Sequence, residues 1–304
     1  MTGGAGFIGS HVADAFVERG DQVLVVDDFS SGSRDYVPDR ANLAELDIAD
    51  SDLVQEAFAG FEPEYICHLA AQASVTVSVK EPKRDFDSNV LGTFNILNSA
   101  TEHRARTVFA STGGALYGEG APIPTDESYV AQPLSPYGAS KQAAEAFVGA
   151  LARFHGIDHA VLRLGNVYGP RQSPHGEAGV VAIFSERLLL DRPVIAYGHG
   201  TPTRDYVHVG DVARAFVTLA DTSAAGTFNL GWGREVSVLD VLDGLQQAAG
   251  TSVEPQLEAL RSGELTRSAI DSTAADRAFG WRPEIQLEDG LADTFRWYAD
   301  TYGG

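Results

Sequence analysis

Tyr137 and Lys141 lie four residues apart and form the pair in this sequence best suited to proton transfer. Side chains at this spacing share one face of a helix. A phenol has an ordinary pKa of about 10 and is a weak base at neutral pH, but a nearby ammonium favours the phenolate. The pair could therefore take a proton from a hydroxyl group. An amphipathic helix face is the bland alternative, but the pair follows several strand–helix units and a strand ending in Ser111-Thr112, which favours the chemical interpretation.

Three glycines at the start of the chain, Gly3, Gly6 and Gly9, have the spacing Gly-x-x-Gly-x-x-Gly. A loop of this kind binds the pyrophosphate of a dinucleotide when it joins a buried strand to a helix. Too few residues precede Gly3 to form that strand, so a flexible leader is an equal alternative if the motif stands alone. We expect the natural polypeptide to begin upstream of Met1, with about five to eight further residues supplying the strand. Without them an inner sheet edge would stay unpaired, and the 304-residue form would be poorly stable.

An aspartate, Asp27, ends the next predicted strand, 18 residues after Gly9. A carboxylate at this position can accept hydrogen bonds from the two hydroxyls of an adenosine ribose, and it would repel a 2′-phosphate. The spacing therefore favours NAD over NADP, although a turn residue at the strand end is the alternative. Asp47-Ile48, after the following strand, could place a carboxylate and a flat apolar side chain against adenine.

Strand-like and helix-like segments alternate through the first half, which predicts a parallel sheet with helical crossovers. The expected strands are 22–26, 65–69, 107–110 and 160–164, and the expected helices are 10–19, 50–59, 86–103 and 136–154. Asp50-Ser51 resembles a helix N-cap. The rhythm breaks after about Asn166, where Gly169 to Gly179 is expected to be a loop. Later helices are expected at 209–219, 236–249 and 287–298.

Composition and charge exclude several classes of protein. The net charge of −20 supplies no basic face for nucleic acid, and no run of 18 apolar residues predicts a membrane span. One cysteine, Cys67, excludes an internal disulfide and a cysteine-cluster metal site. The eight histidines are scattered, so we expect no metal. The glycine-rich start has no basic segment, so we expect no signal peptide and a cytoplasmic protein.

Six motifs, in this order along the chain, resemble the extended short-chain dehydrogenase/reductase family, and within it the bacterial UDP-glucose 4-epimerases. They are Gly3-Gly4-Ala5-Gly6-Phe7-Ile8-Gly9-Ser10, His68-Leu69-Ala70-Ala71, Ser111-Thr112-Gly113-Gly114-Ala115-Leu116-Tyr117-Gly118, Pro136-Tyr137-Gly138-Ala139-Ser140-Lys141, Asn166-Val167-Tyr168-Gly169-Pro170-Arg171 and Arg204-Asp205-Tyr206-Val207-His208-Val209. The resemblance covers nearly the whole chain. It implies an α/β fold: a Rossmann-type doubly wound parallel sheet in residues 1–168, and a smaller, partly interleaved α/β nucleotide-sugar domain in residues 169–304.

The resemblance also implies a reaction with tightly held NAD. Tyr137 would deprotonate the sugar 4-hydroxyl while hydride passes from C4 to the nicotinamide, whose positive charge also favours a phenolate. The 4-keto sugar would turn over and take the hydride back on its other face. Lys141 would also hold the nicotinamide ribose, and Thr112 would hydrogen-bond the 4-oxygen. Gly113-Gly114 make this loop one residue longer than the commoner form, so Ser111 remains open for that role.

By the same resemblance, residues at several strand ends would contact the cofactor: Gly3, Gly6, Phe7, Ile8, Gly9, Asp27, Asp28, Asp47, Ile48, Ala70, Ala71, Asn89, Tyr137 and Lys141. Those that would contact a UDP-sugar are Thr112, Tyr137, Asn166, Gly179, Val180, Arg204, Arg261, Glu264 and Ser268. Guanidinium groups suit the diphosphate. Arg204 and Arg261 have solvated surface charges as their alternative, and Asn89 has capping of local backbone. A homodimer is expected.

Ser268 is expected to border the 2-substituent of the sugar, seven residues after the phosphate-binding Arg261, although Arg267 competes with Arg261 as the anchor. Relatives with tyrosine here exclude N-acetyl sugars, and a small residue admits them. The sequence therefore predicts 4-epimerisation of UDP-N-acetylglucosamine alongside UDP-glucose.

Rival activities differ in the loop after Thr112. A nucleotide-sugar 4,6-dehydratase has Asp-Glu there and a UDP-glucuronate decarboxylase has Glu, whereas Gly113-Gly114 cannot move protons. An epimerase acting on UDP-uronates stays open, because it needs the same tyrosine, lysine and threonine. A non-catalytic NAD sensor would not need Tyr137 and Lys141.

Overall fold

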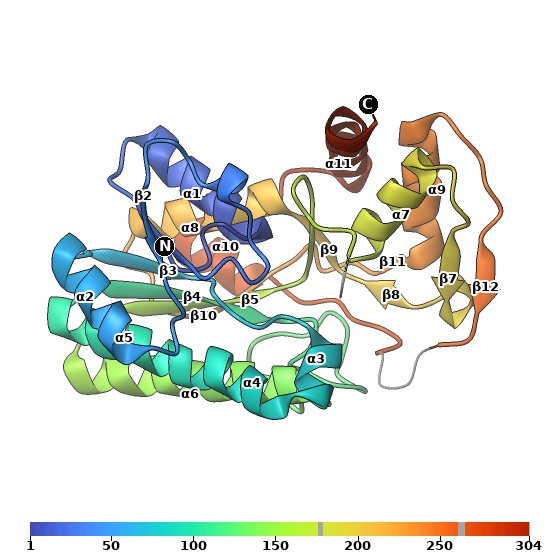
Figure 1. The fold of residues 1–304 in the computed structure, drawn as a ribbon. Coiled ribbons are helices and arrows are strands. Elements are labelled where there is room, and N and C mark those ends of the chain that lie inside the picture. The colour runs from blue at the N-terminus through green and yellow to red at the C-terminus, as the bar shows by residue number, and fades with distance from the viewer. Residues whose placement is uncertain (176–178, 261–264, 304) are drawn as a thin grey trace.

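A computed structural model describes residues 1–175, 179–260 and 265–303 of the chain. Its larger part is a sheet between two helical layers, and its smaller part holds short strands and three helices (Figure 1). Four parallel strands lie in the order β10-β5-β4-β3, with bounds Gly226–Leu230, His159–Leu164, Arg106–Thr112 and Tyr65–His68. A parallel pair, β1 (Leu24–Asp27) and β2 (Asn42–Glu45), extends the sheet beyond β3. This is the expected Rossmann-type order.

The first two residues join the two groups of strands. Thr2 bridges to Val26 in β1 and to His68 in β3. Its N–H donates to the Cys67 carbonyl at 3.0 Å, and the Val26 N–H donates to the Met1 carbonyl at 2.8 Å. Burial lowers the pKa of the Met1 ammonium, which donates to the Leu24 carbonyl at 2.8 Å. Met1 and Thr2 thus lie at the position where the sequence leads us to expect a strand, and the expected upstream start stays a prediction.

Helices cover both faces of the sheet because each presents an apolar face to it. One face carries α1 (Phe7–Arg19), α8 (Val209–Ala220) and α10 (Thr273–Phe279), and the other carries α2 (Ser51–Phe61), α5 (Gly92–His103) and α6 (Pro136–His155) (Figure 1). Asp50 caps α2 as predicted, because its carboxylate accepts from the N–H groups of Asp52 and Leu53. The five central residues of β4 are buried, and the strand separates the two apolar layers.

The helix predicted over 86–103 is interrupted in the structure. Val75–Lys80 (α3) and Pro82–Phe86 (α4) are followed by a π-helical turn, Asp87–Leu91 (η2), which leads into α5. Such turns insert one extra residue and often mark functional positions. Here the turn contains the buried Asn89.

The smaller part of the molecule encloses a second apolar core. β6 (Asn166–Tyr168) pairs with β9 (Tyr206–His208), β7 (Ile195–Tyr197) with β12 (Gln256–Glu258), and β8 (Thr203–Arg204) with β11 (Val236–Ser237). The helices α7 (Val180–Leu189), α9 (Val238–Ala249) and α11 (Leu287–Tyr302) pack against one another around Phe184, Leu242 and Leu291. Two short 3-10 turns, Arg34–Tyr36 (η1) and Gly198–Gly200 (η3), lie in connections.

The chain passes between the two parts more than once. β10 pairs with β5 and α10 packs on β10, so residues far beyond 168 complete the first sheet. The boundary at 168/169 itself stays a prediction.

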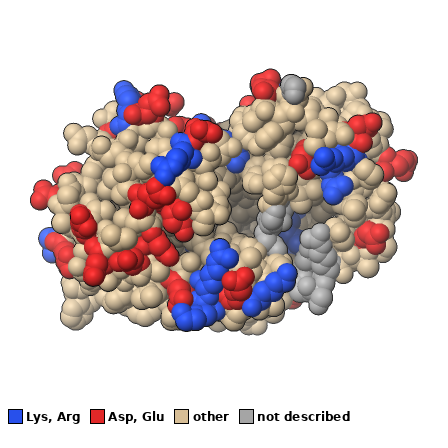
Figure 2. All heavy atoms as spheres, in the orientation of Figure 1, with Lys and Arg blue, Asp and Glu red and all other residues tan. Residues whose placement is uncertain are grey.

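Charged side chains are unevenly distributed over the surface of the described residues. Figure 2 shows acidic side chains gathered over the larger part, and the face is hollowed between the two parts. None of the described helices is both long and apolar enough to span a bilayer. In the described ranges no three His, Cys, Asp or Glu side chains cluster as a metal site would require.

Candidate active site

The glycine loop makes a turn that only glycines can occupy. Gly3 has a φ of +70°, and a Cβ there would lie 2.6 Å from the Ala70 nitrogen. A Cβ on Gly9 would lie 2.0 Å from the Gly3 carbonyl oxygen. These contacts press the loop against the end of β3 and the start of α1. A ligand can therefore approach the backbone closely at this point.

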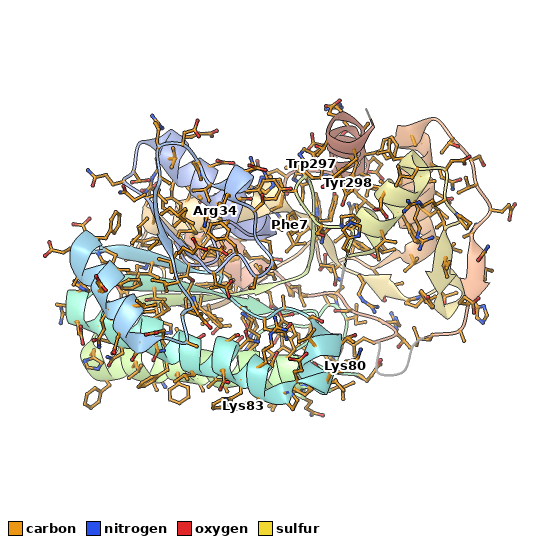
Figure 3. The ribbon with its side chains drawn as sticks, in the orientation of Figure 1. Phe7, Arg34, Lys80, Lys83, Trp297 and Tyr298 are labelled. Carbon is orange, nitrogen blue, oxygen red and sulfur yellow. The ribbon has the colours of Figure 1, made fainter. Side chains whose placement is uncertain are left out.

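The N-terminus of α1 is suited to an anion. Its N-cap, Gly6, provides no capping side chain, and the first turn, which begins with Phe7 and Ile8, contains no acidic residue. The first N–H groups of the helix are therefore left for a ligand, and the helix dipole favours negative charge there. Phe7 lies at the start of this helix in Figure 3. Together with the glycine turn, this end fits the pyrophosphate of a dinucleotide.

Asp27 and Asp28 have different surroundings. The Asp27 carboxylate is 7% exposed and accepts from the N–H groups of Ala5, at 2.9 Å, and Phe29, at 3.0 Å. Burial raises its pKa, and these two bonds oppose the rise. Each oxygen keeps a lone pair for a ribose hydroxyl. Asp28 is exposed and accepts from the backbone and hydroxyl of Ser30, as expected of a turn residue.

The adenine side of the expected site is less specific. Asp47 is exposed and accepts from the Ala49 N–H at 2.9 Å. Ile48 is 6% exposed and packs so closely on Gly92 that a Cβ there would lie 2.6 Å from its Cδ1 atom. Ile48 is therefore part of the core, and its contact with adenine stays a prediction.

Asn89 fixes the loop that follows Ala70 and Ala71. Its Oδ1 accepts from the Gln72 N–H at 2.8 Å, and its Nδ2 donates to the Gln72 carbonyl at 2.9 Å. The same Nδ2 lies 3.1 Å from the Ser140 Oγ. Asn89 therefore fixes local backbone, as the alternative for it would require, and its contact with a cofactor stays a prediction.

Lys141 lies at the centre of the site with its charge almost fully enclosed. The residue is 3% exposed, and its Nζ donates to the Ala110 carbonyl at 3.0 Å and lies 4.8 Å from the centre of the Phe109 ring. Burial lowers its pKa to about 8, while the carboxylates of Asp85 and Glu145 act in the opposite direction. At neutral pH the ammonium form therefore predominates.

Tyr137 is held beside Thr112. Burial raises its pKa to about 12, the charge of Asp85 adds to this rise, and a hydrogen bond with Thr112 opposes it. In the polypeptide alone the phenol is thus protonated at neutral pH. Additional positive charge next to it is needed before it can act as a base.

The structure distinguishes the two candidate hydroxyls at the end of β4. The Ser111 hydroxyl is buried and donates to Glu145 at 2.5 Å, and Glu145 is held by Arg163 at 2.7 Å. Ser111 is therefore part of a buried ion-pair network on the α6 side. Thr112 is partly exposed and faces Tyr137.

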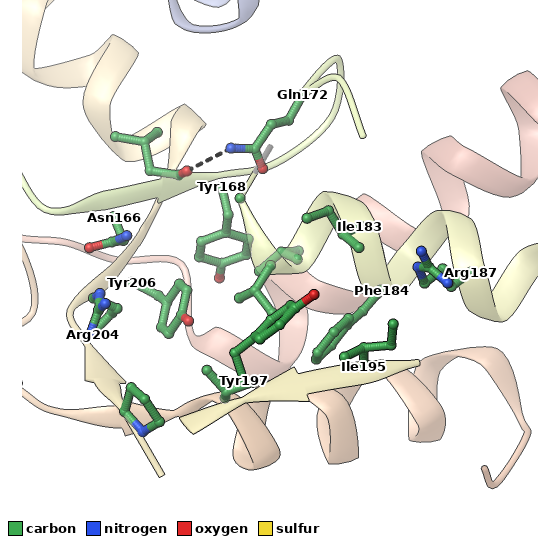
Figure 4. A pocket seen from close by; sticks show the side chains of 16 residues that line it. Asn166, Tyr168, Gln172, Ile183, Phe184, Arg187, Ile195, Tyr197, Arg204 and Tyr206 are labelled. Carbon is green, nitrogen blue, oxygen red and sulfur yellow. Dashed lines mark hydrogen bonds between the residues drawn. The ribbon is translucent and has the colours of Figure 1, made fainter. Parts of the chain in front are cut away.

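A cavity of about 390 Å³ lies beside this group in the smaller part. Gly114 lies between Asn166 and Thr112. A Cβ at this position would lie 3.3 Å from the Asn166 Oδ1 and 4.0 Å from the Thr112 Oγ1, and because glycine has no side chain the space between them stays open. Asn166 and Arg204 lie side by side at one end of the cavity and Arg187 at the other (Figure 4). Four expected substrate residues therefore line one cavity: Asn166, Gly179, Val180 and Arg204.

Other expected substrate residues lie elsewhere. Arg261 and Glu264 are outside the described residues. Ser268 donates its N–H to the Thr203 carbonyl at 3.2 Å, next to Arg204, but does not line the cavity. Arg267 forms an ion pair with Glu235 at 2.5 Å, so in this structure its guanidinium is paired with a carboxylate.

The sequence analysis missed several residues of the site. Gln172, Tyr197 and Tyr206 line the cavity, and Gln172 donates to the Val167 carbonyl at 3.2 Å (Figure 4). Asp85 is buried behind the reacting pair. Tyr206 lies within the motif that begins at Arg204, and Gln172 directly follows the motif that ends at Arg171, so both could have been found from motifs that we singled out.

Residues 1–231 match the family model described as NAD dependent epimerase/dehydratase family. The chain belongs to this family. The matched residues include the motifs at the ends of β1, β3 and β4 and at the start of α6.

Named relatives align with this chain over nearly its whole length. A UDP-glucose 4-epimerase of Mycolicibacterium smegmatis is 41% identical over 305 residues, which cover 98% of this chain and 97% of that protein. A Thermotoga maritima UDP-glucose 4-epimerase with UDP-glucose has a TM-score of 0.96 and 42% identity, with 99% and 98% of the two chains covered. A Thermus thermophilus UDP-glucose 4-epimerase in complex with NAD has a TM-score of 0.92, 42% identity and the same coverage.

Proposed function

We propose that this protein is an NAD-dependent UDP-glucose 4-epimerase, which interconverts UDP-glucose and UDP-galactose through a transient 4-keto sugar. The observation that carries the proposal is the continuity of the site. Thr112, Tyr137 and Lys141 lie at the end of β4, and Gly114 lies between Thr112 and Asn166, which lines the cavity together with Arg204. The names and coverage of the relatives support the same activity.

Several residues fit NAD. The glycine turn and the uncapped start of α1 suit its pyrophosphate, and Asp27 suits the adenosine ribose. Ala70 and Ala71 lie at the end of β3, where Asn89 fixes the loop that follows them. Bound NAD would supply the hydride acceptor and donor for C4 of the sugar.

Side chains of the protein carry out the proton transfer. Tyr137 accepts the proton of the 4-hydroxyl, and Lys141, charged at neutral pH, lowers the cost of a phenolate beside it. Thr112 donates a hydrogen bond to the 4-oxygen. Because the phenol returns the proton to the oxygen after the sugar has turned over, the residues end the cycle as they began it.

The cavity suits the UDP part of the substrate. Arg204 and Asn166 lie at the end nearest Thr112, where a sugar diphosphate would lie. Gly179 is the N-cap of α7 and provides no capping side chain, so the first N–H groups of α7 can bind an oxygen of the nucleotide. The Gly113-Gly114 pair provides no acid or base, which argues against a 4,6-dehydratase.

We expect purified protein to convert UDP-galactose to UDP-glucose without added NAD. The Tyr137→Phe variant should keep its NAD but lose roughly 10²–10⁴-fold in kcat, the usual contribution of a general base. Chromatography of the nucleotide sugars measures turnover, and chromatography of the NAD released on denaturation measures how much cofactor the variant keeps. A 4-keto-6-deoxy product would indicate a dehydratase, and variant activity within about tenfold of wild type would contradict the role of Tyr137.

The two hydroxyls of β4 should affect different properties. We expect Thr112→Val to lower kcat by roughly 10²-fold or more, as loss of a donor to the reacting oxygen does. Ser111→Ala should instead lower the free energy of unfolding by about 1–3 kcal/mol, because it removes the Ser111 donor to the partly buried Glu145 carboxylate. Turnover assays and denaturant titration distinguish the two. A larger loss of kcat in Ser111→Ala would reverse the assignment.

We propose that the enzyme also acts on UDP-N-acetylglucosamine. By the family resemblance, a small side chain at 268 admits an N-acetyl group and an aromatic ring excludes it. Ser268 does not line the cavity, but it bonds Thr203, which directly precedes the cavity residue Arg204. We expect Ser268→Tyr to lower kcat/KM for the N-acetyl sugar and to spare UDP-glucose, and Ser268→Ala to behave as wild type. A wild type that turns over UDP-glucose but forms no UDP-N-acetylgalactosamine would contradict this substrate range.

We also propose that two copies pair through the outer face of α5 and α6. Phe94 and Phe147 are each about 40% exposed with ring centres 5.9 Å apart, and Phe154, about two turns further along α6, is 83% exposed. An apolar patch of this kind marks an interaction surface. Analytical ultracentrifugation should show a dimer that Phe147→Asp dissociates and Leu53→Asp, on α2, does not. A monomeric wild type would contradict the proposal.

We place the enzyme in the cytoplasm because its single cysteine, Cys67, is a free, buried thiol and it uses no disulfide. Fractionation of the native cells should recover it with the cytoplasmic proteins, and recovery with the membranes would contradict this.

A further inference from the structure

A buried carboxylate, Asp85, lies behind the reacting pair and has no role in the reaction as described. It is 1% exposed. Its Oδ1 accepts from the Gln72 Nε2 at 2.7 Å and from the Asn89 Nδ2 at 3.2 Å. It makes no ion pair within 4 Å with any residue that the structure describes. A carboxylate buried in this way is costly unless a positive charge is near.

The hydrogen bonds of Asp85 lead to the turn of α6 that holds Tyr137 and Lys141. Asn89 Nδ2 lies 3.1 Å from the Ser140 Oγ, and the Ser140 hydroxyl donates to the Tyr137 carbonyl at 2.9 Å. Ser140 directly precedes Lys141. The chain from Asp85 through Asn89 to Ser140 thus connects the buried carboxylate to the backbone between the two reacting side chains.

Among the described groups near Lys141, one carboxylate is not paired with another cation. The groups that interact electrostatically with it are Asp85 of α4, Glu145 of α6 and His68 of β3, and Tyr137 lies one helical turn before it on α6. Glu145 is already matched by Arg163, at 2.7 Å. His68 is neutral, since burial lowers its pKa to about 3, and Tyr137 is a protonated phenol in the chain alone. Asp85 is therefore the negative charge that remains to balance the ammonium.

We propose that Asp85 is a positioning residue of the active site, which orients the Tyr137–Lys141 turn through Asn89 and Ser140 and balances the charge of the buried ammonium. Its carboxylate keeps Lys141 charged in the closed interior. It also discourages a phenolate at Tyr137 until positive charge arrives with the cofactor. The Tyr137–Lys141 pair can therefore accept a proton once the cofactor is bound. The kinetic part of this inference rests on the proposed function.

Lysine NMR provides a test that is independent of activity. The chain has only three lysines, Lys80, Lys83 and Lys141, so ¹³C-labelled lysine gives three side-chain signals. Figure 3 labels Lys80 and Lys83 on the outside of the larger part, and Lys83 pairs with Asp87. These two serve as internal references for Lys141.

Asp85→Asn keeps an oxygen for Gln72 and Asn89 but removes the charge. We expect it to lower the pKa of Lys141 by roughly one unit or more, because the Asp85 carboxylate favours the ammonium and an asparagine carries no charge. The alkaline limb of the kcat–pH profile should move to lower pH by the same amount. The matched control Asp87→Asn should change only the signal of Lys83. An unmoved Lys141 signal in Asp85→Asn would overturn the inference.

Wild-type protein tests the inference even if Asp85→Asn does not fold. Burial without a counter-charge can lower the pKa of a lysine to about 5–6. We expect Lys141 to titrate near 8, as its surroundings indicate. Titration below about 6 would show that Asp85 does not balance it. If the wild type does not epimerise UDP-galactose, the proposed function fails, and the lysine titration still decides the role of Asp85.

Discussion

Burial of one ammonium group, that of Lys141, is the constraint on which the rest of the site depends. Removing a charge from water costs several kcal/mol even after relaxation, so the fold must supply compensating contacts. It does so with the Ala110 carbonyl, the Phe109 ring and two carboxylates. These groups come from β4, α4 and α6. The same enclosure makes the charge strong enough to act on the neighbouring phenol, because few waters screen it.

The junction of β4 and α6 fixes the geometry of the reacting group. Ser135 caps α6, and a Cβ on Gly138 would lie 2.5 Å from the Ala115 carbonyl oxygen, so the helix start lies directly on the loop after Thr112. A larger residue at 138 would move Tyr137 away from Thr112. The other side of that loop opens through Gly114 to the cavity in the smaller part. One loop thereby connects proton transfer with binding of the nucleotide sugar.

Much of this could be predicted from the sequence where function depends on spacing. The Tyr137–Lys141 interval, the glycine turn and the cap at Asp50 are local patterns, and the structure has each as expected. The π-helical turn around Asn89 could not be predicted, because a helical periodicity does not show one inserted residue. The direction of the Ser111 hydroxyl depends on Glu145, 34 residues away in sequence. The counter-charge Asp85 likewise becomes visible only when α4 packs on α6.

The fate of the hydrogen on C4 tests the central claim most directly. In this account one site removes a hydride from C4 and returns it to the same carbon, while Tyr137 exchanges only the proton on oxygen. UDP-galactose carrying deuterium at C4 should therefore give UDP-glucose that retains the deuterium at C4, in ordinary water and without added NAD. Loss of the deuterium to solvent would contradict the account, since it would require C4 to exchange its hydrogen as a proton.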